Sequence, residues 1–320
     1  MGSNLGRAAC PTPPRRILFF SKFNEATKGL VAPPNLNFHL NRIPRSVFLA
    51  YDSLFMKKPR SRQGKLHDTQ SSPDFRNLRI DKVGVKGLRY PIVVRDRSRA
   101  TQNTVATVAL AVDLPHQFKG THMSRFLEVL QDHGGLIHVQ SIPKILRALQ
   151  DKLHAESAHL ELEFPYFIEK KAPVSGSPGL VDYQTRFDAV LHGDDLTFKV
   201  AVTVPVTTLC PCSKAISTRG AHNQRGYVRL EVTFRKPVWI EDLVALVESC
   251  GSSEIYSLLK RPDEKHVTEK AYDRPVFVED LVRAVAMQCD AHPEISWYRV
   301  EAENLESIHN HSAYAMLERG

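Results

Sequence analysis

The chain has 320 residues, of which 42% are hydrophobic and 24% charged, with a formal net charge of +8. This length is enough for one large or two ordinary domains with a substantial core, and the composition is that of a soluble globular protein. The longest apolar runs, such as Val105–Val112, have the length of a strand and fall short of the roughly 18 residues that cross a bilayer. We therefore expect no membrane partner.

The cysteines are sparse and odd in number: Cys10, Cys210, Cys212, Cys250 and Cys289. They do not resemble the disulfide framework of a secreted protein and indicate a reducing compartment, which we take to be the cytoplasm. Cys250 and Cys289 lie in helix-like stretches, where we expect them to be small core residues.

The positive charge is concentrated in residues 1–72, which hold 12 Lys/Arg and 3 Asp/Glu and so carry +9. Because the whole chain is +8, the remainder carries −1, and we expect no nucleic-acid partner for the folded body, residues 73–320. The segment is rich in Pro, Ser and Arg without periodicity, which predicts a flexible basic extension that is dispensable for chemistry. A disordered tail, a transit-like peptide and an upstream extension of a chain starting at Met56 all remain open.

From Asn77 onward, alternating apolar and polar residues predict strands in 78–96, 104–114 and 158–170. Helical spacing predicts helices in 121–134 and 141–158. The first of these has Thr121 as a candidate cap and Gly134 at its end. The stretch 170–179 is a Pro/Gly/Ser break.

A similar order then recurs. The pattern predicts, in chain order, a hairpin of 180–195 and 196–208, a strand in 227–234, helices in 239–251 and 277–292, and a closing strand in 296–308. Two successive units of hairpin, helix pair and strand predict an α+β fold of two related modules, roughly residues 73–175 and 176–320.

Cys210 and Cys212 stand one residue apart, and His222 follows among polar residues in a predicted loop between two strands. Two thiols this close do not form an unstrained disulfide with each other, so metal ligation and thiol chemistry remain. In an extended segment the two side chains would point to opposite sides, one toward a metal and the other toward a substrate. The alternative is that both are incidental loop cysteines.

A second polar cluster lies near the C-terminus, where His309 and His311 follow Glu306. On a strand, residues two apart project to the same face, and clustered His with Glu is typical of a metal or acid–base site. A solvated terminal strand is the alternative. Glu264 and Glu279 read alone pass for surface carboxylates, and Glu279 stands where a helix begins, so that its charge would also complement the helix dipole.

The motifs "TLCPCSKAIS", "GAHNQR", "GTHMSRF" and "ESIHNHSAYA" together resemble the type IB GTP cyclohydrolases, from about Ser72 to the C-terminus. The resemblance implies a tunnelling fold (T-fold), a homotetramer with active sites where subunits meet, and hydrolysis of GTP to 7,8-dihydroneopterin triphosphate and formate, the entry step to folate. One departure is Gly226, where the family has Ser, and we expect it to loosen a backbone contact.

The resemblance also implies roles for individual residues. Cys210, His222, Glu264 and His309 match the metal ligands, and Cys212 and His311 match positions of proton transfer. Glu279 matches the carboxylate that anchors guanine. The physical basis is that a carboxylate accepts two hydrogen bonds from guanine that adenine does not offer.

The implied ligand set of one sulfur, two nitrogens and one oxygen suits Zn²⁺, Fe²⁺ or Mn²⁺ and does not select among them. For the triphosphate, basic residues beside the motifs are candidates, each of which is also explicable as a plain surface residue. These candidates are Lys214, Arg219, Arg225 and Arg125.

Two other functions are weighed against this one. The T-fold also hosts a nitrile reductase with one cysteine nucleophile and NADPH, but the second cysteine and the His/Glu set favour a metal. The basic N-terminal segment suggests a zinc-stabilised module that binds RNA or protein, but the near-neutral body has no basic, aromatic-rich stripe.

Overall fold

The structure is a computed structural model of the chain, and it describes residues 68, 70, 72–134, 137 and 141–320. All of them lie in the second of the two units into which the chain divides, His67–Gly320. The predicted flexible extension 1–72 lies outside the described residues except for Asp68, Gln70 and Ser72. These few residues contact the body: Gln70 Nε2 donates to Thr121 O at 2.8 Å.

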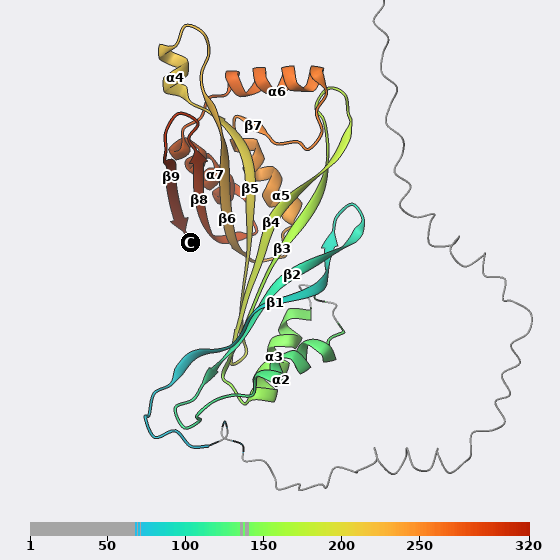
Figure 1. Ribbon diagram of the computed structural model, residues 1–320, viewed down its shortest axis with the longest axis vertical. Helices are drawn as coiled ribbons and strands as arrows, with labels where there is room; N and C mark the ends of the chain where they lie inside the picture. The colour runs from blue at the N-terminus through green and yellow to red at the C-terminus, as the bar shows by residue number, and fades with distance from the viewer. Residues whose placement is uncertain (1–67, 69, 71, 135–136, 138–140) are drawn as a thin grey trace, which may run out of the picture. The chain divides into compact units, whose positions relative to one another are not determined.

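A single sheet organises the described part of the chain, in which nine strands pair antiparallel throughout. Its order is β1-β2-β3-β4-β5-β6-β8-β9, and the short β7 pairs with the end of β5 (Figure 1). The strands are β1 (Ile80–Asp96), β2 (Ala100–Leu114), β3 (Ser157–Lys171), β4 (Pro178–His192), β5 (Asp195–Leu209), β6 (Asn223–Phe234), β7 (Ser253–Glu254), β8 (Ile295–Leu305) and β9 (Ser312–Arg319).

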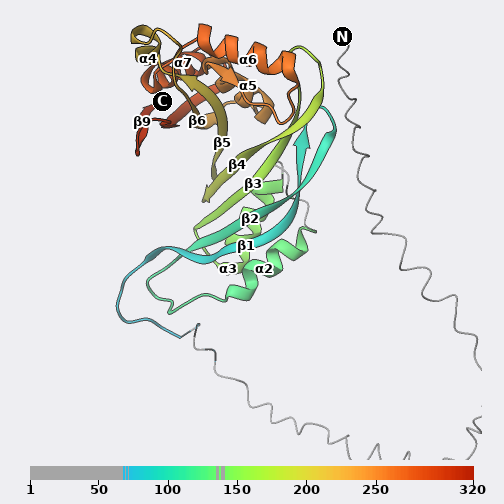
Figure 2. The ribbon, with the colours of Figure 1, turned by 45° about the horizontal axis from the view of Figure 1, so that its top comes forward.

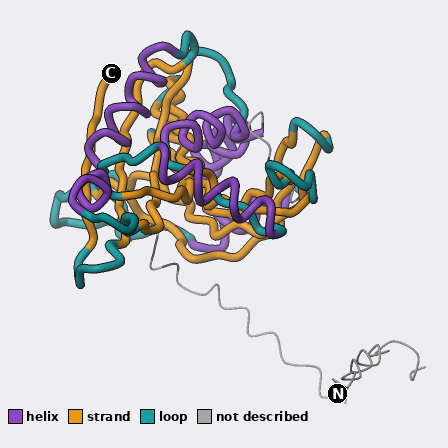
Figure 3. Tube along the Cα trace, turned by 90° about the horizontal axis from the view of Figure 1, so that it is seen from above, coloured by secondary structure: helices purple, strands orange, loops and turns teal. Residues whose placement is uncertain are grey.

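Two groups of helices pack beside the sheet, and Figure 3 shows helices in purple and strands in orange. Helices α2 and α3 contact β1–β4, whereas α5 and α7 contact β5, β6, β8 and β9. The helices are α2 (Met123–Asp132), α3 (Ile142–Leu153), α4 (Pro211–Ile216), α5 (Ile240–Cys250), α6 (Arg261–Asp273) and α7 (Val278–Ala291). Within the described residues, no helix is long and apolar enough to cross a membrane.

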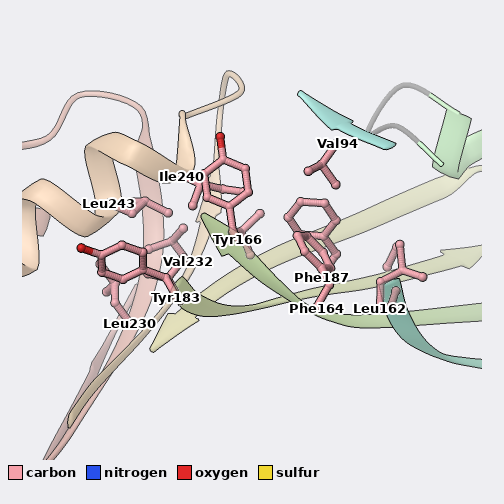
Figure 4. Close-up of a cluster of buried hydrophobic side chains, with 14 of the residues drawn as sticks. Val94, Leu162, Phe164, Tyr166, Tyr183, Phe187, Leu230, Val232, Ile240 and Leu243 are labelled. Carbon is pink, nitrogen blue, oxygen red and sulfur yellow. The ribbon is translucent and has the colours of Figure 1, made fainter. Parts of the chain in front are cut away.

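Alternation along the strands places the apolar residues on one face of the sheet. Cross-strand partners form a transverse row that runs from β3 to β8, and each member is at most 4% exposed: Leu162, Phe187, Val200, Val232 and Tyr298. These residues form one core with the buried residues of both helix groups, so all four helices cover the same face of the sheet. Figure 4 shows part of this core around Phe164 and Phe187.

The opposite face of the sheet carries charged residues. Arg186 on β4 pairs with Asp188 at 2.8 Å and with Glu161 on β3 at 3.2 Å, and Lys199 on β5 pairs with Glu231 on β6 at 3.5 Å. Because strand alternation is strict here, the sequence pattern alone assigns these side chains to the helix-free face.

The predicted α+β fold and the hairpin around 192–195 are confirmed. The predicted module boundary at residue 175 falls inside the β3–β4 hairpin. The order of two strands, helices and two strands occurs once before the turn at 193–194, in β1–β4, and again after it, in β5, β6, β8 and β9 with the helices between β6 and β8. The prediction that Thr121 caps α2 is wrong, because His122 is the N-cap and makes no side-chain capping bond. Cys289 is buried as predicted, and Cys250 is half-buried.

Candidate active site

The loop between β5 and β6 contains the short helix α4, and its sequence explains why. Cys210 is the N-cap, its Sγ accepts a hydrogen bond from Ser213 N at 3.4 Å, and Pro211 occupies the first helical position, where its missing N–H is not needed. Cys212 therefore lies on the first turn of a helix, exposed to solvent. The prediction that the two thiols alternate along an extended segment is wrong, although they still have different surroundings.

His222 lies at the other end of the same loop, and the fold orients its ring. Cys210 N donates to His222 O at 3.1 Å, which joins the two ends of the loop. His222 Nδ1 lies 3.1 Å from Gln224 Oε1. Because an amide oxygen only accepts, this contact requires Nδ1 to donate and leaves Nε2 as the ring nitrogen available to a ligand. Gln224 is itself buried and donates to Glu306 Oε1 at 3.3 Å.

His309 and His311 lie in the loop between β8 and β9, so the prediction that they share one face of a strand is wrong. Their rings are instead stacked, with centroids 5.1 Å apart and planes 17° apart. The loop approaches His222, because Ser307 Oγ lies 3.3 Å from His222 Nδ1. Both histidines are exposed and accessible to a ligand.

Glu279 lies in the first turn of α7, as predicted, with its side chain exposed. The segment that enters α7 is held against the site, since Val276 N donates to Leu209 O at 3.0 Å, one residue before Cys210. The ends of β5, β6 and β8 therefore bring together the Cys210 loop, the His309 loop and the start of α7. Figure 2 shows α4, α6 and α7 gathered at this end of the sheet.

Glu264 and Arg125 are not brought to Cys210 within one chain. Glu264 lies in the first turn of α6, and the opposite end of that helix contacts α4, where Lys214 Nζ donates to Tyr272 O. At 1.5 Å per residue, Glu264 is about 12 Å from Tyr272 along the helix axis. Arg125 is on α2, at the other end of the sheet from α4, where its Nη1 donates to Lys152 O at 3.3 Å.

No group of three or more His, Cys, Asp or Glu side chains among the described residues is arranged to hold a metal ion. The two predicted ligands that the chain itself joins nevertheless have suitable chemistry. The Cys210 sulfur accepts a backbone N–H, and His222 presents Nε2 while a neighbour contacts Nδ1. Cys210 and His222 thus fit a thiophilic divalent metal, and Glu264 and His309 remain predicted ligands.

The basic candidates differ in their freedom to bind a ligand. Lys214 is engaged with Tyr272, over whose ring its Nζ also lies at 4.2 Å. Arg219 is exposed in the loop after α4. Arg225 is exposed on the helix-free face of β6 and, with Tyr227 and Tyr256, lines a hollow of about 350 Å³.

Gly226 lies on β6 directly behind the site. Its pairing with Val206 and Asn304 runs without a register shift, and the expected loosening of a backbone contact stays a prediction. A residue with a side chain would be crowded at this position, because its Cβ would lie 2.6 Å from Asn304 Oδ1. Within the described residues, that oxygen and Thr208 Oγ1 are buried without a hydrogen-bond partner.

The family model described as "Type I GTP cyclohydrolase folE2" matches residues 66–315. The chain belongs to this family. The match begins at residue 66 and includes every predicted site residue. Residues 1–65, which make up most of the predicted N-terminal extension, lie outside it.

Curated FolE2 proteins align with this chain along nearly their whole length. Proteins named GTP cyclohydrolase FolE2 are 60% identical in Akkermansia muciniphila (80% of this chain and 98% of the relative), and 58% identical in Magnetococcus marinus (80% and 96%). Among solved structures, uricase from Arthrobacter globiformis aligns over 75% of this chain and 92% of its own at 10% identity, with a TM-score of 0.41. A likeness this low carries no argument about function.

Sequence reasoning missed the residues that orient the ligands, namely Ser213, Gln224 and Ser307. Gln224 did leave a signal. It stands at a strand position whose neighbours in the alternation, Gly226 and Val228, face the core, and a buried amide there needs a polar partner.

Proposed function

We propose that this chain is a GTP cyclohydrolase that converts GTP and water to 7,8-dihydroneopterin 3′-triphosphate and formate, the first step of tetrahydrofolate biosynthesis. The family membership carries this conclusion, together with the gathering of Cys210, His222, His311 and Glu279 at one end of the sheet. The near-neutral body and the sparse, unpaired cysteines among the described residues support a cytoplasmic enzyme without a nucleic-acid partner.

Recognition of guanine is assigned to Glu279. Its carboxylate is exposed in the first turn of α7 and takes part in none of the ion pairs among the described residues. It is therefore available to accept two hydrogen bonds, from the ring N–H and the amino group of guanine. Adenine offers a different donor pattern in that arrangement, so the same contact selects GTP over ATP.

A divalent metal is assigned to Cys210 and His222, with His309 and Glu264 completing the set. When bound, the cation supplies Lewis acidity, which activates water at neutral pH. Cys212 and His311 hold and move protons during opening of the imidazole ring and release of formate. Their exposure beside the ligand residues supports this division, since a proton carrier must reach the substrate.

A homotetramer is proposed because one chain leaves the site incomplete. Glu264 and Arg125 are both separated from Cys210 within the chain, so another copy must supply part of the wall. The outer strands β1 and β9 each leave one edge without a strand partner in the described sheet, and such edges are suited to pairing with another copy. The triphosphate is assigned to the basic residues that have free guanidinium groups, Arg219 and Arg225 first.

The test is incubation of the protein with GTP and with Zn²⁺, Mn²⁺ or Fe²⁺ in separate reactions, following formate and the fluorescent oxidised pterin. We expect product from GTP and none from ATP. Glu279→Ala should lose most of the rate, since a bidentate contact that positions the substrate is removed. Asp280→Ala is the matched control, because Asp280 is the neighbouring carboxylate and pairs with Arg283 at 2.9 Å. Equal rates for Glu279→Ala and Asp280→Ala would overturn the assignment.

A further inference from the structure

Helix α6, which carries Glu264, is unusual in how it is held. Among its residues only Asp263 and Ala271 are buried, so it has no apolar stripe to fix its rotation or its position along its axis. Polar contacts hold it instead. At its C-terminal end Lys270 pairs with Glu254 on β7 at 2.6 Å, and Tyr272 O accepts from Lys214.

At the N-terminal end the contact is a fully buried carboxylate. The side chain of Asp263 is 0% exposed, and both of its oxygens are used. Oδ1 accepts from Val174 N and Ser175 N, each at 2.8 Å, and Oδ2 accepts from Ser175 Oγ at 2.7 Å and from Lys260 N at 2.9 Å. A buried carboxylate is stable only when it is so satisfied.

These four bonds join two elements that are far apart in the sequence. Lys260 is the N-cap of α6, and Val174 and Ser175 form the turn of the β3–β4 hairpin, nearly 90 residues earlier. Figure 1 shows this hairpin beside the end of α6. Asp263 therefore ties the first turn of α6 to the sheet, and Glu264 is the next residue on that turn.

We propose that Asp263 is a positioning residue that fixes the Glu264 carboxylate for metal binding by clamping the first turn of α6 to the β3–β4 hairpin. This rests on the proposed function, in which Glu264 is a metal ligand. Apart from Asp263 and Ala271 no residue of α6 is buried, so without Asp263 only the far end of the helix remains anchored, about 12 Å from Glu264 along the helix axis. A ligand carried on a loosely held turn binds metal less tightly than one held in place.

The informative variant is Asp263→Ala. Alanine removes both carboxylate oxygens, so the bonds from Val174 N, Ser175 N, Ser175 Oγ and Lys260 N are all lost. The side-chain link between the β3–β4 hairpin and the first turn of α6 is thereby removed. Ser175→Ala removes a single bond of the four and is the milder variant, while Glu269→Gln alters an exposed carboxylate on the same helix and is the matched control.

The experiment titrates the full-length protein with Co²⁺ and records the affinity and the d–d absorption, with circular dichroism to establish that each variant is folded. We expect Asp263→Ala to weaken Co²⁺ binding 10–100-fold, the usual effect of losing a group that supports a ligand, and to change the spectrum in the same way as Glu264→Gln. Ser175→Ala should show a smaller loss and Glu269→Gln none.

Combining the substitutions separates positioning from general destabilisation. If Asp263 acts through Glu264, Asp263→Ala has no further effect on Co²⁺ affinity once Glu264→Gln is present. A double variant in which the two losses multiply would overturn the inference while leaving the metal proposal intact. So would a folded Asp263→Ala protein with wild-type affinity and spectrum. A wild-type protein that binds no Co²⁺ would overturn the metal proposal itself.

Discussion

Replacing Cys210 or Cys212 by Ala tests whether two thiols in one motif have separate functions. Cys210 is half-buried, caps α4 through Ser213 N and is joined to His222 through its backbone. Cys212 is exposed on the first turn of α4, and no cap or core contact depends on it. The first substitution therefore alters a proposed metal ligand and a helix cap, whereas the second alters only an exposed thiol that we propose transfers protons.

The expected magnitudes follow from these surroundings. Loss of an N-cap costs about 0.5–2 kcal/mol, and a sulfur acceptor at 3.4 Å belongs at the low end, so Cys210→Ala should remain folded. Metal content and activity should then fall together. Cys212→Ala should keep the metal but lose proton transfer, which typically contributes 10²–10⁴-fold, or about 3–5 kcal/mol of barrier.

The assay is metal quantification on the purified proteins beside turnover of GTP, at equal protein concentration. Cys250→Ala is the control, since Cys250 is a half-buried thiol on α5 that packs against the core, its Sγ hydrogen-bonds with Ser249 Oγ and Leu246 O, and it has no assigned role in the site. If Cys212→Ala loses its metal as readily as Cys210→Ala, both thiols are ligands and the separation of functions is wrong. If Cys212→Ala turns over GTP at the wild-type rate, the proton-transfer assignment is wrong.

Three further predictions concern the body of the protein. A chain of residues 67–320 should fold and turn over GTP, because it keeps the contact of Gln70 with Thr121, and an insoluble or inactive product would show that the N-terminal segment is part of the structure. Glu248→Ala should lower the free energy of unfolding, measured in urea, by about 3 kcal/mol. The reason is that the Lys170 ammonium, whose side chain is 13% exposed, loses the carboxylate that lies 2.6 Å from it. A loss no larger than that of Glu248→Gln would contradict this. Burial is the largest influence on the pKa of Glu254 and raises it, but the hydrogen bond from Lys270, a backbone hydrogen bond and the charges of Lys270 and Lys170 together outweigh burial and lower the pKa. This carboxylate therefore stabilises the fold above about pH 4.3 and loses that effect as the pH falls through its folded pKa. Lys270→Met should therefore cost about 1 kcal/mol at pH 7 and progressively less below pH 4, as measured by urea unfolding at each pH, and a constant difference would refute the linkage.

The elements with strong apolar periodicity were predictable because burial of one face specifies both their type and their orientation. Strands β2–β6 and helices α3, α5 and α7 were all expected in nearly the observed positions. Helix α6 was not predicted. Its residues lack an apolar stripe, and the features that hold it, Asp263 and Lys270, are single polar contacts to distant parts of the chain.

For the site, the sequence by itself determined which residue types are present and, through long motifs in a fixed order, the family to which they belong. Only the tertiary structure decided their geometry. The strand assumed for His309 and His311 is a loop, and the extended segment assumed for Cys212 is a helix, because a capping residue followed by Pro211 starts a helical turn at once. Tertiary structure also decided that Glu264 lies apart from Cys210, since the position of a polar helix is set by partners that no local pattern reveals.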